Sequence, residues 1–205
     1  MKTYIIGEGK FARNLKNSIK NYNNEILDFC GFLDKKKLSK LIKDKNLKKK
    51  KFKFINGIGN FAYLNYPSKF TKIEKKIDFL KLMHNSANIY KNSIIGKGTI
   101  VSENVLIKSN VRIGKFCIIN SNTIISHDSK IGNFVNISLG AIIAGNVSIG
   151  KNSFVGIGSS IIQNCKIGKN VLIGAGSVVL KNVPDNVVVF GNPAKIIKQN
   201  NNEIK

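Results

Sequence analysis

Histidine is rare in this chain, and one of its two copies stands directly beside an acid. His127 and Asp128 follow the aliphatic residue Ile125 and the small residue Ser126. Imidazole titrates near neutral pH, and a carboxylate partner raises its basicity and fixes its tautomer, so the pair is a candidate general base. Neighbouring residues of a strand point to opposite sides, so the pair can form only where the chain bends. The alternative is that His127 is an exposed side chain with no role.

The other histidine and the three cysteines carry weaker signals. His84 lies between the two halves of the chain and is interpreted as a connector residue. Cys30, Cys117 and Cys165 are odd in number and show no Cys-x-x-Cys spacing, which argues against a disulfide framework and against a zinc site. We therefore expect neither a metal nor a cysteine nucleophile.

A glycine-rich turn near the start of the chain is a candidate phosphate site. Gly7-Glu8-Gly9-Lys10-Phe11-Ala12 follows a short apolar strand and opens a helical stretch that ends near residue 19. Such a turn lets backbone amides approach a phosphate at a helix N-terminus. The motif is weak alone, but an acid about 20 to 25 residues downstream, Asp34, strengthens it. The alternative is that this turn is only part of the scaffold and binds no ligand.

The second half of the chain has a period of six. From Ile89 to Val179, all sixteen residues at this spacing are Ile or Val, and a small residue stands four positions after each. This period fits neither a helix nor an alternating strand. It fits a parallel β-helix of hexapeptides, typically left-handed, whose aliphatic residues point into a triangular prism. Three hexads make one 18-residue coil, which predicts a little over five coils.

Stacking in such a prism predicts contacts between residues far apart in sequence. Residues 18 positions apart lie about 4.8 Å apart along the axis. His127 then projects from the prism, with Ser109 one coil below and Gly145 one coil above. Cys117 and Cys165 fall on different faces, so both are predicted to be packed, unpaired thiols.

The first half of the chain follows a β-α-β order. Strands are predicted over residues 3–6, 26–33 and 52–55, a helix over 69–76, and another strand over 79–83. We expect a small Rossmann-like domain with a parallel sheet over residues 1–83, then the β-helix and a short C-terminal tail over 84–205. About 80 residues are too few for a full dinucleotide fold, so one nucleotide or nucleotide-sugar fits better.

Composition excludes some classes of protein. The chain has 205 residues and a net charge of +23, but Arg13 and Arg112 are its only arginines and the lysines are spread along it. This argues against nucleic-acid binding, although a positive field suits a polyphosphate ligand. The chain has no apolar run of membrane-spanning length and no apolar leader at its N-terminus, so we expect no membrane span and a cytoplasmic location.

Together these segments resemble, from end to end, a bacterial sugar acyltransferase family. The family includes the UDP-4-amino-sugar N-acetyltransferases of surface-glycan pathways and the sialic acid O-acetyltransferases. The resemblance rests on residues 7–13, on Phe32-Leu33-Asp34, on Ile58-Gly59-Asn60, on residues 126–135 and on the closing Gly191-Asn192-Pro193-Ala194-Lys195. It implies a homotrimer and acetyl-CoA as the acyl donor, with no metal.

The resemblance also implies roles for individual residues. His127 would accept the proton, Asp128 would raise its basicity, and the backbone amide of Gly145 would hold an oxyanion. Acetyl-CoA would bind at Asn136, Ile157 and Ala175, with Leu139 on the same face. The nucleotide-sugar, expected to be a UDP-4-amino-sugar, would bind at Gly9, Lys10, Asp34, Lys35 and Gly59.

Two positions depart from the family. Asn136 stands where the family often has His, and Asn can donate a hydrogen bond but cannot carry a proton. The glycine-rich turn is one residue shorter than in the bacillosamine-pathway enzymes. The expected function is N-acetylation of a nucleotide-linked 4-amino-deoxy sugar by direct transfer. Acetylation of a sugar hydroxyl, as on sialic acid, is the nearest alternative, and a non-catalytic nucleotide-binding or scaffold β-helix is another.

Overall fold

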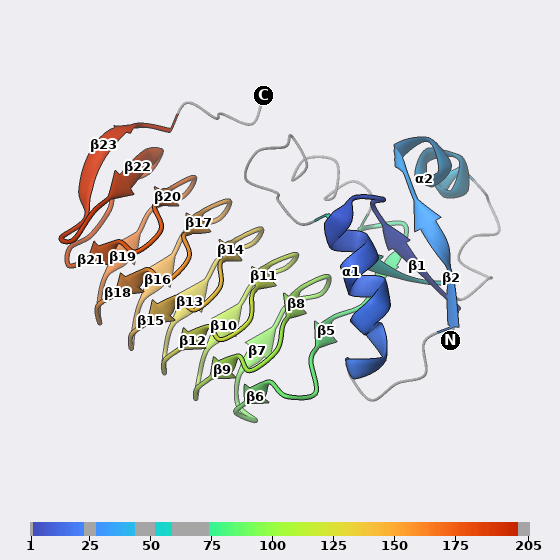
Figure 1. The fold of residues 1–205 in the computed structure, drawn as a ribbon, viewed down its shortest axis with the longest axis horizontal. Helices are drawn as coiled ribbons and strands as arrows, with labels where there is room; N and C mark the ends of the chain where they lie inside the picture. The colour runs from blue at the N-terminus through green and yellow to red at the C-terminus, as the bar shows by residue number, and fades with distance from the viewer. Residues whose placement is uncertain (1, 23–27, 44–51, 59–73, 201–205) are drawn as a thin grey trace.

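The N-terminal part of the chain is a parallel α/β layer. The computed structural model describes residues 2–22, 28–43, 52–58 and 74–200. The sheet has the order β2-β1-β3-β4, and every pair is parallel (Figure 1). Its elements are β1 (Lys2–Ile6), α1 (Lys10–Ser18), the 3-10 helix η1 (Ile19–Asn21), β2 (Asp28–Leu33), α2 (Lys35–Ile42), β3 (Lys53–Asn56) and β4 (Asp78–Phe79).

Three of the predicted strands are present, but the strand predicted over residues 79–83 is wrong as a single element. It divides into β4 and a strand of the prism, β5 (Leu82–Met83). The reason is a change of partner, because Leu80 N–H bonds the carbonyl of Phe54 while Leu82 N–H bonds that of Thr99. Of the helix predicted over residues 69–76, residues 69–73 lie outside the described part, and residues 74–76 form a turn.

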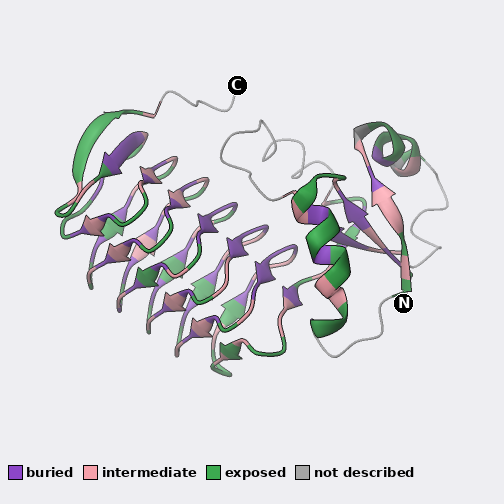
Figure 2. Cartoon of the chain, in the orientation of Figure 1, coloured by how far each residue is buried: buried purple, intermediate pink, exposed green. Residues whose placement is uncertain are grey.

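The rest of the chain is a parallel β-helix of the left-handed hexapeptide type with about six coils. The aliphatic series forms one continuous buried core. Figure 2 shows buried residues along the coils of the prism. The five-stranded sheet contains β7 (Ile94–Ile95), β10 (Arg112–Ile113), β13 (Lys130–Ile131), β16 (Ser148–Ile149) and β19 (Lys166–Ile167). The six-stranded sheet contains β6 (Asn88–Ile89), β9 (Leu106–Ile107), β12 (Ile124–Ile125), β15 (Ile142–Ile143), β18 (Ser160–Ile161) and β21 (Val178–Val179).

The third sheet has eight strands and carries the end of the chain. It contains β5, β8 (Ile100–Val101), β11 (Ile118–Ile119), β14 (Asn136–Ile137), β17 (Phe154–Val155), β20 (Leu172–Ile173), β22 (Val187–Phe190) and β23 (Lys195–Gln199). Only β23 runs antiparallel, and residues 191–194 of the closing motif form the turn before it. No helix in the described ranges is long and apolar enough to cross a membrane.

The corners of the prism depend on a left-handed residue in each turn. From residue 98 to residue 176, every sixth residue has a positive φ, and nearly all of these are Asn or Gly. These residue types tolerate the conformation, which is strained for most others. The non-glycine members are Asn104, Asn110, Phe116, Asn122, Asp128, Phe134, Asn146, Asn152, Asn164 and Asn170.

Two phenylalanines at these corners join the prism to the α/β layer. Phe116 (φ 56°) and Phe134 (φ 60°) stack with ring centroids 5.3 Å apart. Phe79 of β4 packs edge-on to Phe116 at 4.8 Å. These three rings belong to a buried cluster that also contains Ile6, Leu33 and Phe54 of the N-terminal sheet, so one apolar core spans both parts of the chain.

Candidate active site

The bend that the dyad requires is present. His127 and Asp128 lie in the turn between β12 and β13, where Asp128 has a φ of 62°. Nδ1 of His127 is 2.8 Å from Oδ2 of Asp128, and both side chains are more than half exposed. The left-handed residue therefore brings together two side chains that an extended strand would point apart.

A third side chain holds the other oxygen of the carboxylate. The amide nitrogen of Asn110, one coil below, donates to Oδ1 of Asp128 over 3.0 Å. The hydrogen bonds from His127 and then from Asn110 lower the pKa of Asp128 below its ordinary value. An ionised carboxylate only accepts, so Nδ1 of His127 carries the hydrogen and Nε2 keeps a free lone pair. The sequence prediction missed Asn110, although its distance of 18 residues from Asp128 was a usable signal.

Gly145 lies directly against the imidazole ring. A Cβ at this position would be 2.7 Å from both Cε1 and Nε2 of His127. Within the described residues, the backbone N–H of Gly145 donates no hydrogen bond. A basic nitrogen and an unengaged amide donor therefore stand side by side, the pair that acyl transfer requires.

The residues predicted to bind acetyl-CoA occupy a different corner. We call the turns from the six-stranded to the five-stranded sheet the dyad corner, and those from the eight-stranded to the six-stranded sheet the apolar corner. Leu139 (49% exposed) and Ile157 (56% exposed) stack at the apolar corner with Ala175. The six-stranded sheet separates this corner from His127, so one chain alone does not bring them together.

Asn136 is buried on the outward side of the eight-stranded sheet rather than exposed at either corner. It lies on β14 and is 5% exposed. Its Oδ1 accepts from the amide of Asn120 over 3.1 Å, and the same amide donates to the carbonyl of Ile137 over 2.8 Å. The structure therefore places Asn136 apart from Ile157 and Ala175, next to Asn120.

The glycine-rich turn lies at the carboxyl ends of the first three strands. Gly7 has a φ of 114°, and a Cβ on it would be 3.0 Å from the carbonyl oxygen of Gly57, so only glycine fits. Gly9 is the N-cap of α1 and has no side chain to satisfy the first amides of that helix. Lys10, the first residue of the helix, is exposed. This edge is where parallel α/β sheets bind ligands.

Asp34 has a structural task at the same edge. Its Oδ1 accepts from the backbone N–H of Lys37 over 2.6 Å and caps α2, which begins at Lys35. Lys37 in turn pairs with Glu8 of the glycine-rich turn at 3.1 Å, and this contact raises the pKa of Lys37. Gly59 lies outside the described residues.

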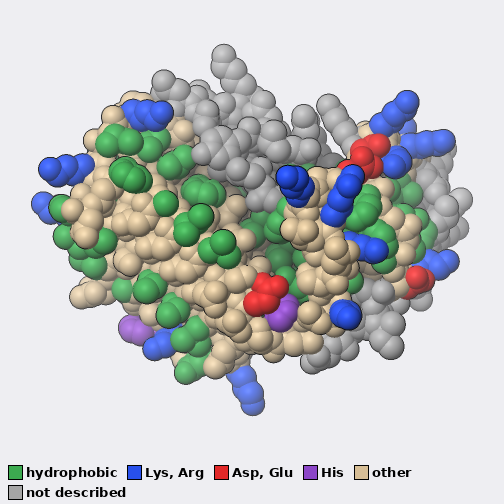
Figure 3. All heavy atoms as spheres, in the orientation of Figure 1, with side chains coloured by type: hydrophobic (Ala, Val, Ile, Leu, Met, Phe, Trp, Pro, Cys, Tyr) green, Lys and Arg blue, Asp and Glu red, His purple; other side chains and the backbone are tan. Residues whose placement is uncertain are grey.

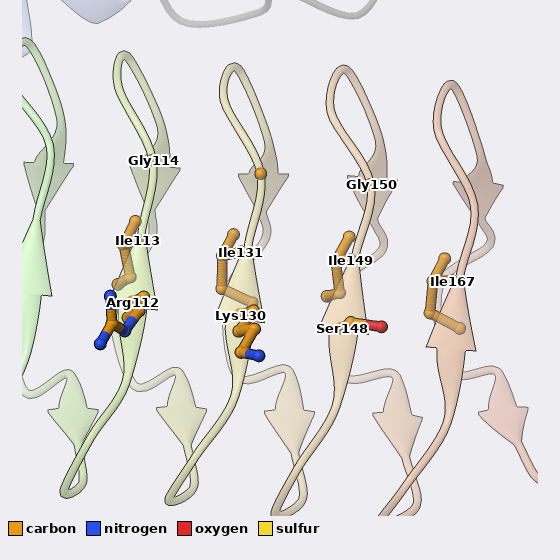
Figure 4. A pocket seen from close by; sticks show the side chains of 10 residues that line it. Arg112, Ile113, Gly114, Lys130, Ile131, Ser148, Ile149, Gly150 and Ile167 are labelled. Carbon is orange, nitrogen blue, oxygen red and sulfur yellow. The ribbon is translucent and has the colours of Figure 1, made fainter.

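A shallow groove of about 480 Å³ runs over the five-stranded sheet. Arg112 of β10, Lys130 of β13 and Ser148 of β16 line it (Figure 4). The two basic residues each stand two positions after a member of the dyad-corner turns, Asn110 and Asp128. The groove therefore places positive charge beside the dyad, which the sequence prediction did not identify. On the face in Figure 3, the Lys and Arg side chains lie at several separate places over both parts of the chain.

The cysteines take no part in this site. Cys117 and Cys165 are buried, unpaired and inside the prism, as predicted. Burial raises the pKa of Cys117 to about 12, which keeps it as the neutral thiol. The thiol of Cys117 donates to the carbonyl of Gly132 over 3.0 Å. The described residues contain no group of three metal-ligating side chains.

His84 stabilises the connection between the two parts of the chain. Its Nδ1 is 2.8 Å from Oγ of Ser86, and its ring packs edge-on to that of Tyr22 at 5.1 Å. Burial is the main cause that raises the pKa of Tyr22. These contacts agree with the interpretation of His84 as a connector residue.

Comparisons with known proteins bear on this arrangement. The bacterial transferase hexapeptide family (six repeats) matches residues 146–181. PerB from Caulobacter crescentus, solved with CoA and GDP-perosamine, superposes with a TM-score of 0.83 at 25% identity over 96% of this chain and 97% of that one. The acetyltransferase domain of PglB from Neisseria gonorrhoeae, solved with acetyl coenzyme A, gives 0.79 at 25% identity over 96% and 98%. No curated protein matches the sequence.

The chain carries a run of bacterial transferase hexapeptide repeats and is an acyltransferase. A further fold match supports the architecture of this acyltransferase: WeeI from Acinetobacter baumannii, with a TM-score of 0.79 at 24% identity over 96% of this chain and all of that one. The acyltransferase shares both its prism and its N-terminal layer with these structures, because the matches cover nearly the whole of each chain.

Proposed function

We propose that this acyltransferase moves the acetyl group of acetyl-CoA to the amine of a nucleotide-linked 4-amino-deoxy sugar in surface-glycan biosynthesis. The observation that carries the proposal is the His127–Asp128 pair beside the Gly145 amide. The similarity to PerB, solved with CoA and GDP-perosamine, supports both substrate classes.

The chemistry divides among three groups of the chain. As the sugar amine attacks the thioester carbonyl, Nε2 of His127 takes the amine proton, and Asp128 stabilises the resulting imidazolium. The Gly145 N–H donates to the carbonyl oxygen as negative charge develops on it. A carbon–nitrogen bond forms, the carbon–sulfur bond breaks, and the leaving thiolate receives the proton from His127.

The rest of the chain would bind and orient the two substrates. The nucleotide-sugar is proposed to lie against a Rossmann-like unit of residues 1–83, at Gly9, Lys10, Asp34, Lys35 and Gly59. Asp34 would use the carboxylate oxygen that does not cap α2. The pantetheine arm would follow the apolar corner past Ile157 and Ala175. Arg112 and Lys130 would attract the phosphates of either substrate.

A complete site requires a second copy of the chain, and a homotrimer would supply it. The outward residues of the six-stranded sheet include Leu106, Ile124, Ile142 and Val178, and Ile142 is 45% exposed. An apolar sheet face of this kind is typical of an oligomer interface. Around a cyclic axis, the dyad corner of one protomer would meet the apolar corner of the next.

The acceptor panel is the direct test of the proposed reaction. Purified protein would be given acetyl-CoA with UDP-, dTDP- and GDP-linked 4-amino-deoxy sugars and with sialic acid, and the products treated with mild alkali. The expected result is turnover of one amino sugar to an alkali-stable amide. An alkali-labile ester on sialic acid would support O-acetylation instead. The absence of turnover with every acceptor, although CoA binds, would support a non-catalytic role.

A further inference from the structure

The dyad corner carries a column of hydrogen-bonded amides that ends on Asp128. Asn92, Asn110 and Asp128 belong to the turns after β6, β9 and β12, in three successive coils (Figure 1). The amide of Asn92 donates to Oδ1 of Asn110 over 2.6 Å. The amide of Asn110 donates to Oδ1 of Asp128 over 3.0 Å. Each donor therefore points toward the dyad.

This column can run in only one direction. Oδ1 of Asn92 accepts from the backbone N–H of Asn110 over 3.4 Å. Nδ2 of Asn92 is therefore the group that faces the side chain of Asn110. If the Asn110 amide flipped, its NH2 would face the NH2 of Asn92 and its oxygen would face a carboxylate. Both contacts would be repulsive, so Nδ2 of Asn110 is held toward Asp128.

We propose that Asn110 is the positioning residue of the dyad. Its amide occupies Oδ1 of Asp128 and leaves Oδ2 to accept from Nδ1–H of His127, which keeps the basic lone pair on Nε2. This inference rests on the proposed function, because it assigns Asn110 to the base in that reaction.

The direction of this column determines what Asp128→Asn would do to His127. The new side chain has one acceptor and one NH2 group, and Asn110 would hold the acceptor toward itself. The NH2 group would then face Nδ1 of His127, which would have to accept, and the hydrogen would move to Nε2. The base would be lost because His127 would adopt the wrong tautomer. Removing Asn110 would let the new amide at position 128 flip, so that its oxygen could again accept from Nδ1–H of His127.

The test compares Asn110→Gly, Asp128→Asn and the double variant, with Asn170→Gly as the matched control. Glycine keeps the left-handed turn because it adopts positive φ without strain. Asn170 has a φ of 54° and bonds Asn186 of the next coil, but at another corner. We expect N110G to lower kcat about tenfold at constant KM, and N170G to leave kcat unchanged. The double variant should exceed D128N in kcat several-fold.

Two outcomes would overturn the role of Asn110. One is a wild-type kcat in N110G, and the other is a double variant no faster than D128N. A purely structural defect would make the two losses add rather than compensate. His127→Ala, measured alongside, separates this inference from the function on which it rests. If that variant kept wild-type turnover, the proposed function itself would fail.

Discussion

At the scale of single residues, the site depends on which side chains share one turn. The sequence predicted His127 and Asp128 as a pair on the condition of a bend, and the left-handed φ of Asp128 supplies it. That bend was foreseeable, because Asp128 falls in a six-residue series of Asn and Gly. The burial of Asn136 was not foreseeable, because it depends on the packing of its surroundings rather than on the hexad period.

Gly145→Ala tests the contact between the ring and the backbone. The new methyl group would lie 2.7 Å from Nε2 of His127 if the ring stayed in place, so the ring must move. A shift of this size is expected to lower kcat about a hundredfold. Because the exposed ring can move freely, the free energy of unfolding should change by less than about 0.5 kcal/mol. An unchanged kcat would place the reaction away from Gly145.

The carboxylate of Asp128 should stay ionised to a lower pH than an ordinary aspartate does. Hydrogen bonds from His127 and Asn110 hold its pKa below the ordinary 3.8. Because the folded-state pKa is lowered, the carboxylate keeps its charge and its hydrogen bond from His127 at and above pH 3.8. Both are lost only as the pH falls through the lowered pKa. Carboxyl carbon NMR should show this titration, and it should move back toward 3.8 in Asn110→Gly. A titration above 3.8 in the wild type would contradict the geometry.

At the scale of elements, the hexad period determines strands and corners but not what packs on them. The aliphatic series predicted the prism, and the six-residue series of Asn and Gly marks its corners. Phe116 and Phe134 break that series because their rings pack under the α/β layer rather than face solvent. The division of residues 79–83 between two sheets escaped prediction for the same reason, since a change of strand partner leaves no mark in local sequence.

Phe116→Ala measures what this aromatic junction contributes. Removing a fully buried ring should lower the free energy of unfolding by about 3–5 kcal/mol, as judged by urea denaturation. Asn122→Ala is the matched control, because Asn122 has a φ of 60° but is exposed. Asn122→Ala should lower the free energy of unfolding only by the cost of placing alanine in the left-handed conformation, about 1–2 kcal/mol. A loss in Phe116→Ala no larger than that in Asn122→Ala would contradict a strongly stabilising aromatic junction.

At the scale of the whole molecule, the proposed homotrimer would bring the two separated corners together. The dyad corner and the apolar corner flank the same sheet, whose outer face is apolar. The sequence placed His127 and Ile157 in one site through the family resemblance alone. A single prism separates them. In the proposed homotrimer a corner of a neighbour would complete the site, and no property of one chain read in isolation predicts which corner.

Mixing two inactive variants tests this shared site. His127→Ala lacks the base, and Ile157→Arg would block the apolar corner. Co-expressed in equal amounts, the two should recover about a quarter of wild-type activity, because one interface in four joins an intact dyad to an intact corner in a cyclic assembly. Activity that stays at the level of the separate variants would show that each chain carries a whole site.

The most direct measurement is the turnover of His127→Ala with the best acceptor from the panel. If His127 is the base, kcat should fall about 10²- to 10⁴-fold, while the Kd for acetyl-CoA measured by calorimetry stays the same. A kcat within about twofold of wild type, with acetyl-CoA bound as before, would show that the dyad does not carry the proton transfer.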